Sequence, residues 1–175
     1  SPVNHRFFSQ DHQVVLAVGR LTEAKNFGLL IRAFHQLHQI YPATRLIILG
    51  EGELRAEFET LIAELNLTDV VDLPGFDPNP YAYFKYVSLF VLSSNWEGLP
   101  GVLIQALASK VKVVSTDCPS GPREILADGQ FGLLVPCEDQ QALSHAMHQA
   151  LYHDYVEFDA DAFKQHCLQF HKDTV

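Results

Sequence analysis

Basic residues, cysteines and long apolar runs are all scarce in this chain of 175 residues. Twelve lysines and arginines stand against 21 aspartates and glutamates, and the resulting net charge of −9 argues against nucleic acid or an anionic membrane as a general partner. The cysteines, Cys118, Cys137 and Cys167, are odd in number and form no C-x-x-C pair, which favours reduced thiols in the cytoplasm. No apolar run reaches the roughly 18 residues of a membrane span, and no targeting signal is visible. We therefore expect a soluble cytoplasmic protein in which any anion site is local.

The length and composition fit one globular domain. A chain of this size buries roughly 70% of its unfolded surface and can fold alone. Hydrophobic residues make up 47% of the sequence, and nine prolines and ten glycines are spread along it. Residues 1–12 are polar, with Pro2, Asn4 and His5, and are interpreted as the tail of a linker. Order is expected to begin near Gln13, so residues 13–175 are predicted to form a single domain.

From there on, short apolar runs alternate with longer helical patterns. The predicted strands span about 14–18, 46–49, 70–73, 87–92, 111–115 and 132–135, the predicted helices about 26–40, 53–65, 81–86, 101–109, 140–152 and 161–171, with a further short element at 123–126. Strands that are apolar throughout indicate a sheet covered on both faces, and strand-then-helix repetition indicates parallel pairing with right-handed crossovers. The pattern predicts a doubly wound, Rossmann-like α/β domain, in which ligands bind beyond the carboxyl ends of the strands.

Two cations follow the first predicted strand. Arg20 directly follows Gly19, which allows close approach to the backbone, and Lys25 stands five residues after Arg20. An arginine fork and a compact lysine charge can clamp a diphosphate, although solvated loop charges would look the same from this segment alone. The glycines of Gly50-Glu51-Gly52 resemble half of a dinucleotide fingerprint, but a tight strand-to-helix turn explains them better.

A second candidate segment lies where the strand at 87–92 gives way to a helix. It places Glu97 and two glycines, Gly98 and Gly101, at this junction, and Pro100 suits a first helical turn because its missing N–H costs nothing there. Free amide groups and the positive helix end favour an anionic ligand. In the absence of a ligand, Glu97 would be a carboxylate favoured by the helix dipole.

Five motifs now carry a family resemblance. In order, they are V-G-R-L-x4-N-F with Lys25, L-G-E-G-E-L, L-P-G-F, S-x-x-E-G-L-P and D-G-x-x-G-L-L-V. This series resembles the nucleotide-sugar-binding half of glycosyltransferase family 4, from about Val14 to Val135 or further. The resemblance implies the C-terminal domain of a GT-B fold, whose N-terminal domain, absent here, binds the acceptor across a cleft.

The resemblance also implies roles for individual residues. Arg20 and Lys25 would hold the donor diphosphate with Gly19, and Glu97 would orient the transferred sugar. The family places a second glutamate on the ribose, but Gln105 occupies that position, and an amide must accept from one hydroxyl and donate to the other, at a cost of about 1 kcal/mol. The donor-binding set is completed by Leu73 and Pro74, whose backbone would meet the nucleobase, and by Gly98, Leu99, Pro100, Gly101 and Val102 beside the diphosphate.

The resulting expectation is the donor domain of a retaining hexosyltransferase that uses a UDP- or GDP-linked sugar for a bacterial cell-envelope glycan. No metal or other cofactor is expected, since the cations stabilise the leaving group. The acceptor, a glycan or lipid-linked sugar, would need the absent domain, so this chain alone should bind nucleotide and transfer nothing; the full-length protein could associate peripherally with the inner membrane. The alternatives are a non-catalytic nucleotide-sugar-binding or scaffold domain, suggested by Gln105, and a GT-B epimerase or phosphorylase, although no pyridoxal-binding lysine motif is found.

Other polar residues are expected to be structural. The histidine pairs at 35 and 38 and at 145 and 148 have the i, i+3 spacing that can hold a metal, but no third ligand is near in the sequence, and surface-helix histidines are the preferred interpretation. Arg123 and Glu124 are likewise expected to support the loop that contains them.

Overall fold

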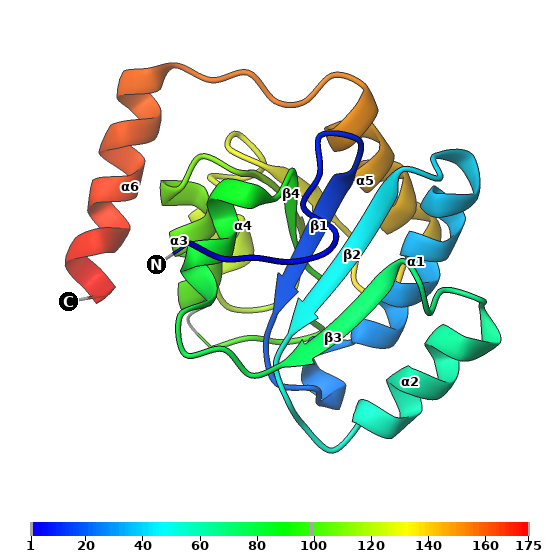
Figure 1. Ribbon diagram of the computed structural model, residues 1–175. Helices are drawn as coiled ribbons and strands as arrows, with labels where there is room; N and C mark the ends of the chain where they lie inside the picture. The colour runs from blue at the N-terminus through cyan, green and yellow to red at the C-terminus, as the bar shows by residue number, and fades with distance from the viewer. Residues whose placement is uncertain (1, 99, 175) are drawn as a thin grey trace.

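The computed structural model describes residues 2–98 and 100–174 and contains a six-stranded parallel sheet (Figure 1). The spatial order is β3-β2-β1-β4-β5-β6, with all neighbours parallel. The order reverses between β1 and β4, as in doubly wound folds. The strands are β1 (Gln13–Val18), β2 (Thr44–Leu49), β3 (Val71–Gly75), β4 (Leu89–Leu92), β5 (Lys112–Thr116) and β6 (Leu133–Val135).

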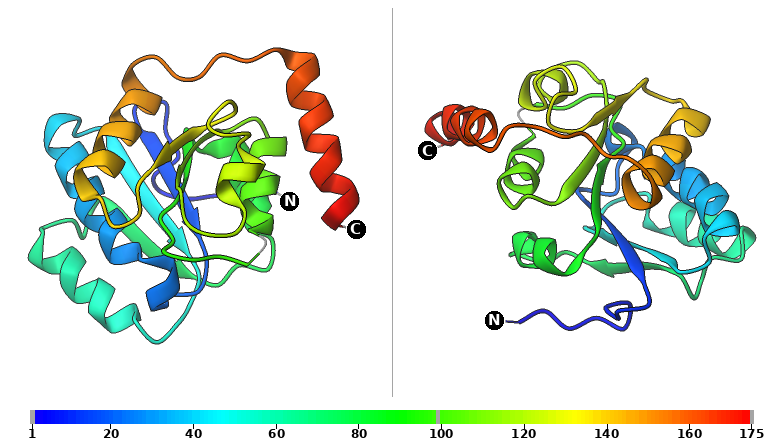
Figure 2. Two further views of the ribbon diagram at one scale, coloured as in Figure 1. Left: turned by 180° about the vertical axis from the view of Figure 1, so that it is seen from behind. Right: turned by 90° about the horizontal axis from the view of Figure 1, so that it is seen from above.

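Helices cover both faces of this sheet (Figure 2). One face carries α1 (Phe27–Ile40), α2 (Arg55–Glu64) and α5 (Gln140–Tyr152), and the other carries the 3-10 helix η2 (Pro80–Tyr86), α3 (Gly101–Ala108) and α4 (Pro122–Ile125). The last helix, α6 (Ala160–Thr174), packs outside α3 after a long connection from α5. A short 3-10 helix, η1 (Glu23–Lys25), precedes α1.

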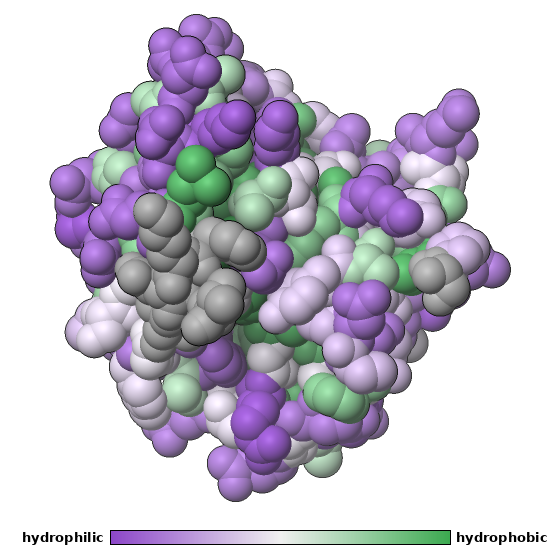
Figure 3. All heavy atoms as spheres, turned by 90° about the vertical axis from the view of Figure 1, so that its left-hand side faces the viewer, coloured by the Kyte–Doolittle hydropathy of each residue, from purple (hydrophilic) through white to green (hydrophobic). Residues whose placement is uncertain are grey.

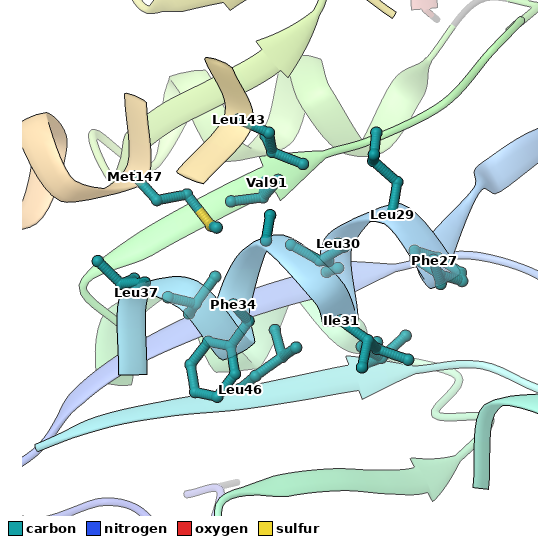
Figure 4. Close-up of a cluster of buried hydrophobic side chains, with 14 of the residues drawn as sticks. Phe27, Leu29, Leu30, Ile31, Phe34, Leu37, Leu46, Val91, Leu143 and Met147 are labelled. Carbon is teal, nitrogen blue, oxygen red and sulfur yellow. The ribbon is translucent and has the colours of Figure 1, made fainter. Parts of the chain in front are cut away.

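The alternation of side chains along the strands explains why they are apolar throughout. In β1, Val15 and Ala17 pack beneath α1, whereas Val14 and Leu16 pack beneath α3 and η2. Both layers consist of buried hydrophobic side chains. Figure 4 shows the first of them, a cluster that includes Phe34 of α1, Leu46 of β2, Val91 of β4, and Leu143 and Met147 of α5. Helices cover both faces of a parallel sheet, which confirms the predicted doubly wound α/β fold. Each strand therefore needs apolar residues on both sides.

Most predicted elements are present within a few residues of their expected bounds. The helix expected at 140–152 has these bounds in the structure, since the Asp139 side chain caps it by accepting from the Ala142 amide at 2.9 Å. The element at 123–126 is the short helix α4. The third strand extends further than expected: it was predicted to end near residue 73, but Pro74 and Gly75 also belong to β3.

The N-terminal segment has no regular secondary structure, as expected of a linker, but it packs on the domain. Phe7 is 2% exposed and lies in the core beneath η2 and α3. His5 Nε2 lies 2.7 Å from the Asp72 carboxylate of β3. The packed part of the domain therefore begins before Gln13, because Phe7, an aromatic residue in a polar segment, is buried in the core.

The face on which α6 lies is mainly hydrophilic, with hydrophobic side chains at the floor of a hollow near its centre (Figure 3). Among the described residues, no helix has the length and apolar content needed to cross a membrane.

Candidate nucleotide-sugar site

Two loops that are far apart in the sequence are tied together at the carboxyl edge of the sheet, the lower edge in Figure 1. Two backbone carbonyls of the segment between β1 and α1 accept hydrogen bonds from the loop between β4 and α3. The Asn95 amide donates to the Ala24 carbonyl at 2.9 Å, and Ser93 Oγ donates to the Lys25 carbonyl at 2.8 Å. Asn26 Nδ2 also donates to Asn95 Oδ1 at 3.2 Å. These bonds fix the segment around Lys25 against the segment around Glu97.

At this junction, Lys25 and Glu97 form an ion pair with 2.7 Å between Lys25 Nζ and Glu97 Oε2. Their side chains are 22% and 6% exposed, so the carboxylate is almost fully withdrawn from water. Ser94 Oγ donates to the same carboxylate oxygen. Within residues 2–98 and 100–174, Glu97 Oε1 has no hydrogen-bond donor, so this oxygen is available to a ligand hydroxyl.

The backbone beneath this pair requires glycine. A Cβ at Gly19 would lie 3.1 Å from Cε of Lys25, so a side chain there would push the lysine stem away. Gly50 has a φ of +151°, and a Cβ on it would overlap the Gly19 carbonyl oxygen. Gly50, directly after β2, therefore lets Gly19, directly after β1, pack closely against it. This agrees with the interpretation of residues 50–52 as a tight turn.

Arg20 lies beside the ion pair in sequence but faces a different space. It is exposed, and in the described part of the chain it makes no ion pair. It lines a cavity of about 570 Å³ at the exits of β1 and β2, together with Gly50 and Phe76. Phe76 is 75% exposed, so an aromatic face and a guanidinium border the same open cavity.

The start of α3 is open as well. A Cβ at either Gly98 or Gly101 would meet nothing within 4 Å, so their backbone is accessible from the crevice. Pro100 is buried. It was expected in the first turn of α3 and instead takes the N-cap position, directly before that turn. Leu99 lies outside the described residues.

The comparisons with known proteins bear on this geometry. Residues 4–164 match the family described as "Glycosyl transferases group 1". The chain belongs to this family. It is 44% identical over 140 residues to the N-acetylgalactosamine-N,N'-diacetylbacillosaminyl-diphospho-undecaprenol 4-alpha-N-acetylgalactosaminyltransferase of Campylobacter jejuni, covering 80% of this chain and 38% of that protein. It spans 30%, 38% and 40% of three curated glycosyltransferases that it matches.

Solved structures agree on the fold of this group 1 glycosyltransferase domain. The pneumococcal O-GlcNAc transferase in complex with UDP and GlcNAc superposes with a TM-score of 0.80 at 22% identity, over 93% of this chain and 34% of that one. The C-terminal domain of a group 1 family protein from Francisella tularensis superposes with a TM-score of 0.73 at 21% identity, over 95% and 89% of the two chains.

The remaining predicted donor-binding residues of this glycosyltransferase domain lie at or near the same edge. Gln105 is half-buried on α3, four residues after Gly101 and so on the same helix face, with Val102 one turn before it. Within the described residues, the Gln105 side-chain amide makes no hydrogen bond. The Leu73 carbonyl accepts from Arg55 Nη2 at 3.1 Å, and Pro74 is exposed.

Sequence reasoning missed the residues behind Glu97. Ser94 and Thr116 are buried polar residues, and Thr116 Oγ1 donates to the Ser94 carbonyl at 2.7 Å. Cys137 Sγ donates to the same carbonyl at 3.7 Å. The S-x-x-E spacing could have indicated the Ser94–Glu97 bond, because a serine three residues before a carboxylate often bonds locally. Thr116 and Cys137 carried no such local signal.

Two of the polar residues expected to be structural, Arg123 and His148, have local partners. Arg123 pairs with Asp117 at 2.6 Å and with Asp128 at 3.3 Å, which supports the loop after β5. His148 Nε2 lies 2.6 Å from the Tyr41 hydroxyl and 2.8 Å from His153 Nε2, so it joins α5 to the end of α1. In the described residues, no group of three or more His, Cys, Asp or Glu side chains has the arrangement of a metal site.

Proposed function

We propose that this domain binds the nucleotide-diphosphate sugar donor of a retaining glycosyltransferase. The observation that carries the proposal is the Lys25–Glu97 ion pair, which lies at the carboxyl edge of the sheet, as does Arg20, a cation without an ion pair in the described part of the chain. In an acidic protein, Arg20 on an open cavity, Lys25 at the neighbouring loop junction and an accessible helix start provide local positive charge for an anion.

The contacts of the ion pair suggest how the work is divided. Lys25 Nζ has three N–H groups and gives one to Glu97, so the others can reach phosphate oxygens. Glu97 Oε2 is occupied by Lys25 and Ser94, which leaves Oε1 to accept from a sugar hydroxyl. Arg20 and Lys25 would stabilise the charge that develops on the diphosphate leaving group, together with amides from Gly98 to Gly101. This role needs neither a metal nor a protein nucleophile.

The rest of the donor would extend over the neighbouring strand exits. We assign the ribose to Gln105 and the nucleobase to the backbone at Leu73 and Pro74. The pneumococcal neighbour with UDP and GlcNAc and the Francisella neighbour, a C-terminal domain, support a donor-binding, C-terminal half of a GT-B enzyme. The acceptor would then bind the part of the protein that this chain does not span. The Campylobacter relative supports a lipid-linked glycan as acceptor.

Titration calorimetry of the chain with UDP, GDP and their sugars tests the proposal. We expect binding of one nucleotide class and no sugar transfer. Arg20→Ala should weaken that binding by roughly ten- to a hundredfold, since a bond to a charged group contributes about 1.5–3 kcal/mol. Arg45→Ala is the charge-matched control, because Arg45 lies at the amino end of β2, opposite the site. Undetectable binding of every nucleotide at millimolar concentration would refute the proposal.

Gln105 supports a second candidate function, a nucleotide-sugar-binding domain without transfer activity. A carboxylate accepts from both ribose hydroxyls, which an amide cannot do. Gln105→Glu separates the two functions when it is introduced into the full-length protein. If the wild-type protein transfers no sugar and the Gln105→Glu variant does, the natural domain is non-catalytic. If the wild-type protein already transfers sugar, the non-catalytic candidate is excluded.

A further inference from the structure

Two cysteines follow neighbouring strands at equivalent positions. Thr116, the last residue of β5, pairs in register with Val135, the last residue of β6. Cys118 and Cys137 each stand two residues beyond these partners. The Asp117 amide donates to the Val135 carbonyl at 2.7 Å, so the pairing continues past the strand ends. The segments that follow β5 and β6 therefore still run side by side directly after the strand ends.

The pleat places the last residues of both strands, Thr116 and Val135, on one face. Val114, Leu133 and Val135 all pack on the side of α1 and α5, and residues two apart on a strand share a face. Thr116 continues the series of Val114, and Cys118 and Cys137 each follow two residues beyond the paired strand ends. Neighbouring strands lie about 4.8 Å apart, which is within the roughly 4.4–6.8 Å between Cα atoms that a disulfide spans.

A shared hydrogen-bond acceptor places the Cys137 thiol beside Thr116, two residues before Cys118. Cys137 Sγ and Thr116 Oγ1 both donate to the Ser94 carbonyl, at 3.7 Å and 2.7 Å. Burial raises the pKa of the Cys118 thiol to about 11, a hydrogen bond with Thr116 lowers it, and the nearby Cys137 thiol adds to the rise. Both cysteines are free thiols in the structure.

We propose that Cys118 and Cys137 form a dithiol pair that closes reversibly into a disulfide directly behind the loop that carries Glu97. The oxidant is a low-molecular-weight disulfide such as oxidised glutathione. Cys137 is more exposed than Cys118, so its thiolate attacks first and forms a mixed disulfide, releasing one glutathione thiol. Cys118 then attacks the Cys137 sulfur and releases the second glutathione. The two protein thiol protons end on the two glutathione thiols, which balances the exchange.

The disulfide reaches the donor site through Ser94. In the disulfide, Cys137 has no S–H to donate to the Ser94 carbonyl, and Ser94 Oγ holds Glu97. We expect oxidised protein to bind the nucleotide sugar about two- to fivefold more weakly, in line with the loss of one weak hydrogen bond. This consequence rests on the proposed function, whereas disulfide formation does not.

The experiment incubates the folded chain with oxidised glutathione and maps disulfides by mass spectrometry of proteolytic peptides. We expect a peptide pair joined through Cys118 and Cys137, reopened by dithiothreitol and unchanged in Cys167→Ser. Cys118→Ser should stop at a mixed glutathione disulfide on Cys137. Separate glutathione adducts on the wild-type cysteines, or unmodified thiols after prolonged oxidation, would overturn the proposal.

Calorimetry on the reduced and oxidised proteins tests the effect on the donor site. A fall in nucleotide-sugar affinity that dithiothreitol reverses supports the coupling, and equal affinities for both forms overturn it. If neither form binds nucleotide while the disulfide still forms, the donor-domain proposal fails and the dithiol pair stands.

Discussion

The Lys25–Glu97 ion pair should contribute measurably to the stability of the fold, and Lys25→Met tests this most directly. Methionine keeps an unbranched stem to pack against Gly19, where Cε of Lys25 lies 3.1 Å from a Cβ position, but it removes the charge. Glu97 then remains as a carboxylate with a side chain only 6% exposed and no cation at 2.7 Å. The substitution therefore isolates the cost of an unpaired buried charge.

The magnitude follows from burial. Two unit charges about 4 Å apart attract by about 4 kcal/mol at an effective dielectric constant of about 20, and desolvation offsets much of this. Removing one partner of a fully buried pair costs about 3–5 kcal/mol. Because Lys25 is 22% exposed, we expect a smaller loss, about 2–3 kcal/mol. At about 2–4 °C per kcal/mol for a domain of this size, Tm should fall by about 5–10 °C.

The assay is urea unfolding of four proteins: wild type, Lys25→Met, Glu97→Gln and the double variant. Glutamine keeps an acceptor for Ser94 and removes the charge, so the double variant should be more stable than Lys25→Met. The coupling free energy should exceed about 1 kcal/mol. Effects of the two substitutions that add to within about 0.5 kcal/mol would show that the pair contributes no stability, and the reasoning from its burial would be wrong.

Three further predictions concern the backbone, a buried hydroxyl and pH. Gly50→Ala should destabilise the fold by at least about 3 kcal/mol in urea unfolding, because its Cβ would overlap the Gly19 carbonyl at a φ of +151°. Tyr155→Phe should cost about 1–3 kcal/mol, since the Val113 amide donates to the Tyr155 hydroxyl at 2.8 Å and would be left unpaired. Burial and two neighbouring histidines lower the pKa of His148, so the unfolded chain binds this proton more readily and stability should fall as pH drops below about 6.5. The urea midpoint measured from pH 7 to pH 5 should decline less steeply in His148→Gln.

Matched variants control each of these. Gly129→Ala also has a positive φ, +93°, but its nearest neighbour would lie at 3.7 Å, so it should cost clearly less than Gly50→Ala. The buried Tyr152 hydroxyl has no hydrogen-bond partner among the described residues, so Tyr152→Phe should be neutral or stabilising. The wild-type protein over the same pH range is the reference for His148→Gln. Equal losses for the two glycines, equal losses for the two tyrosines, or an unaltered slope in His148→Gln would contradict the corresponding argument.

The elements of the fold were predictable because their signals are local. Residues 140–152 show helical periodicity after an N-cap aspartate, and β1 is apolar from Val14 to Val18 because helices cover both of its faces. The bounds of β3 were less predictable, since a proline ordinarily ends a strand and Pro74 instead lies near the end of an edge strand. The packing of residues 2–12 against the sheet was not predicted, because it depends on the burial of Phe7 in the tertiary structure.

The sequence by itself determined that this is a doubly wound α/β domain of a glycosyltransferase family, with Arg20, Lys25 and Glu97 in loops at strand ends. Repeating periods and ordered motifs depend on near neighbours, so they can be read along the chain. Only the tertiary structure decided that Lys25 pairs with Glu97, 72 residues away, and that Ser94, Thr116 and Cys137 lie behind them. It also placed Cys118 and Cys137 two residues beyond strand ends that are paired, through the register of Thr116 on Val135. These contacts depend on which strands are neighbours and how they align, and that follows from the packing of the whole sheet rather than from any single segment.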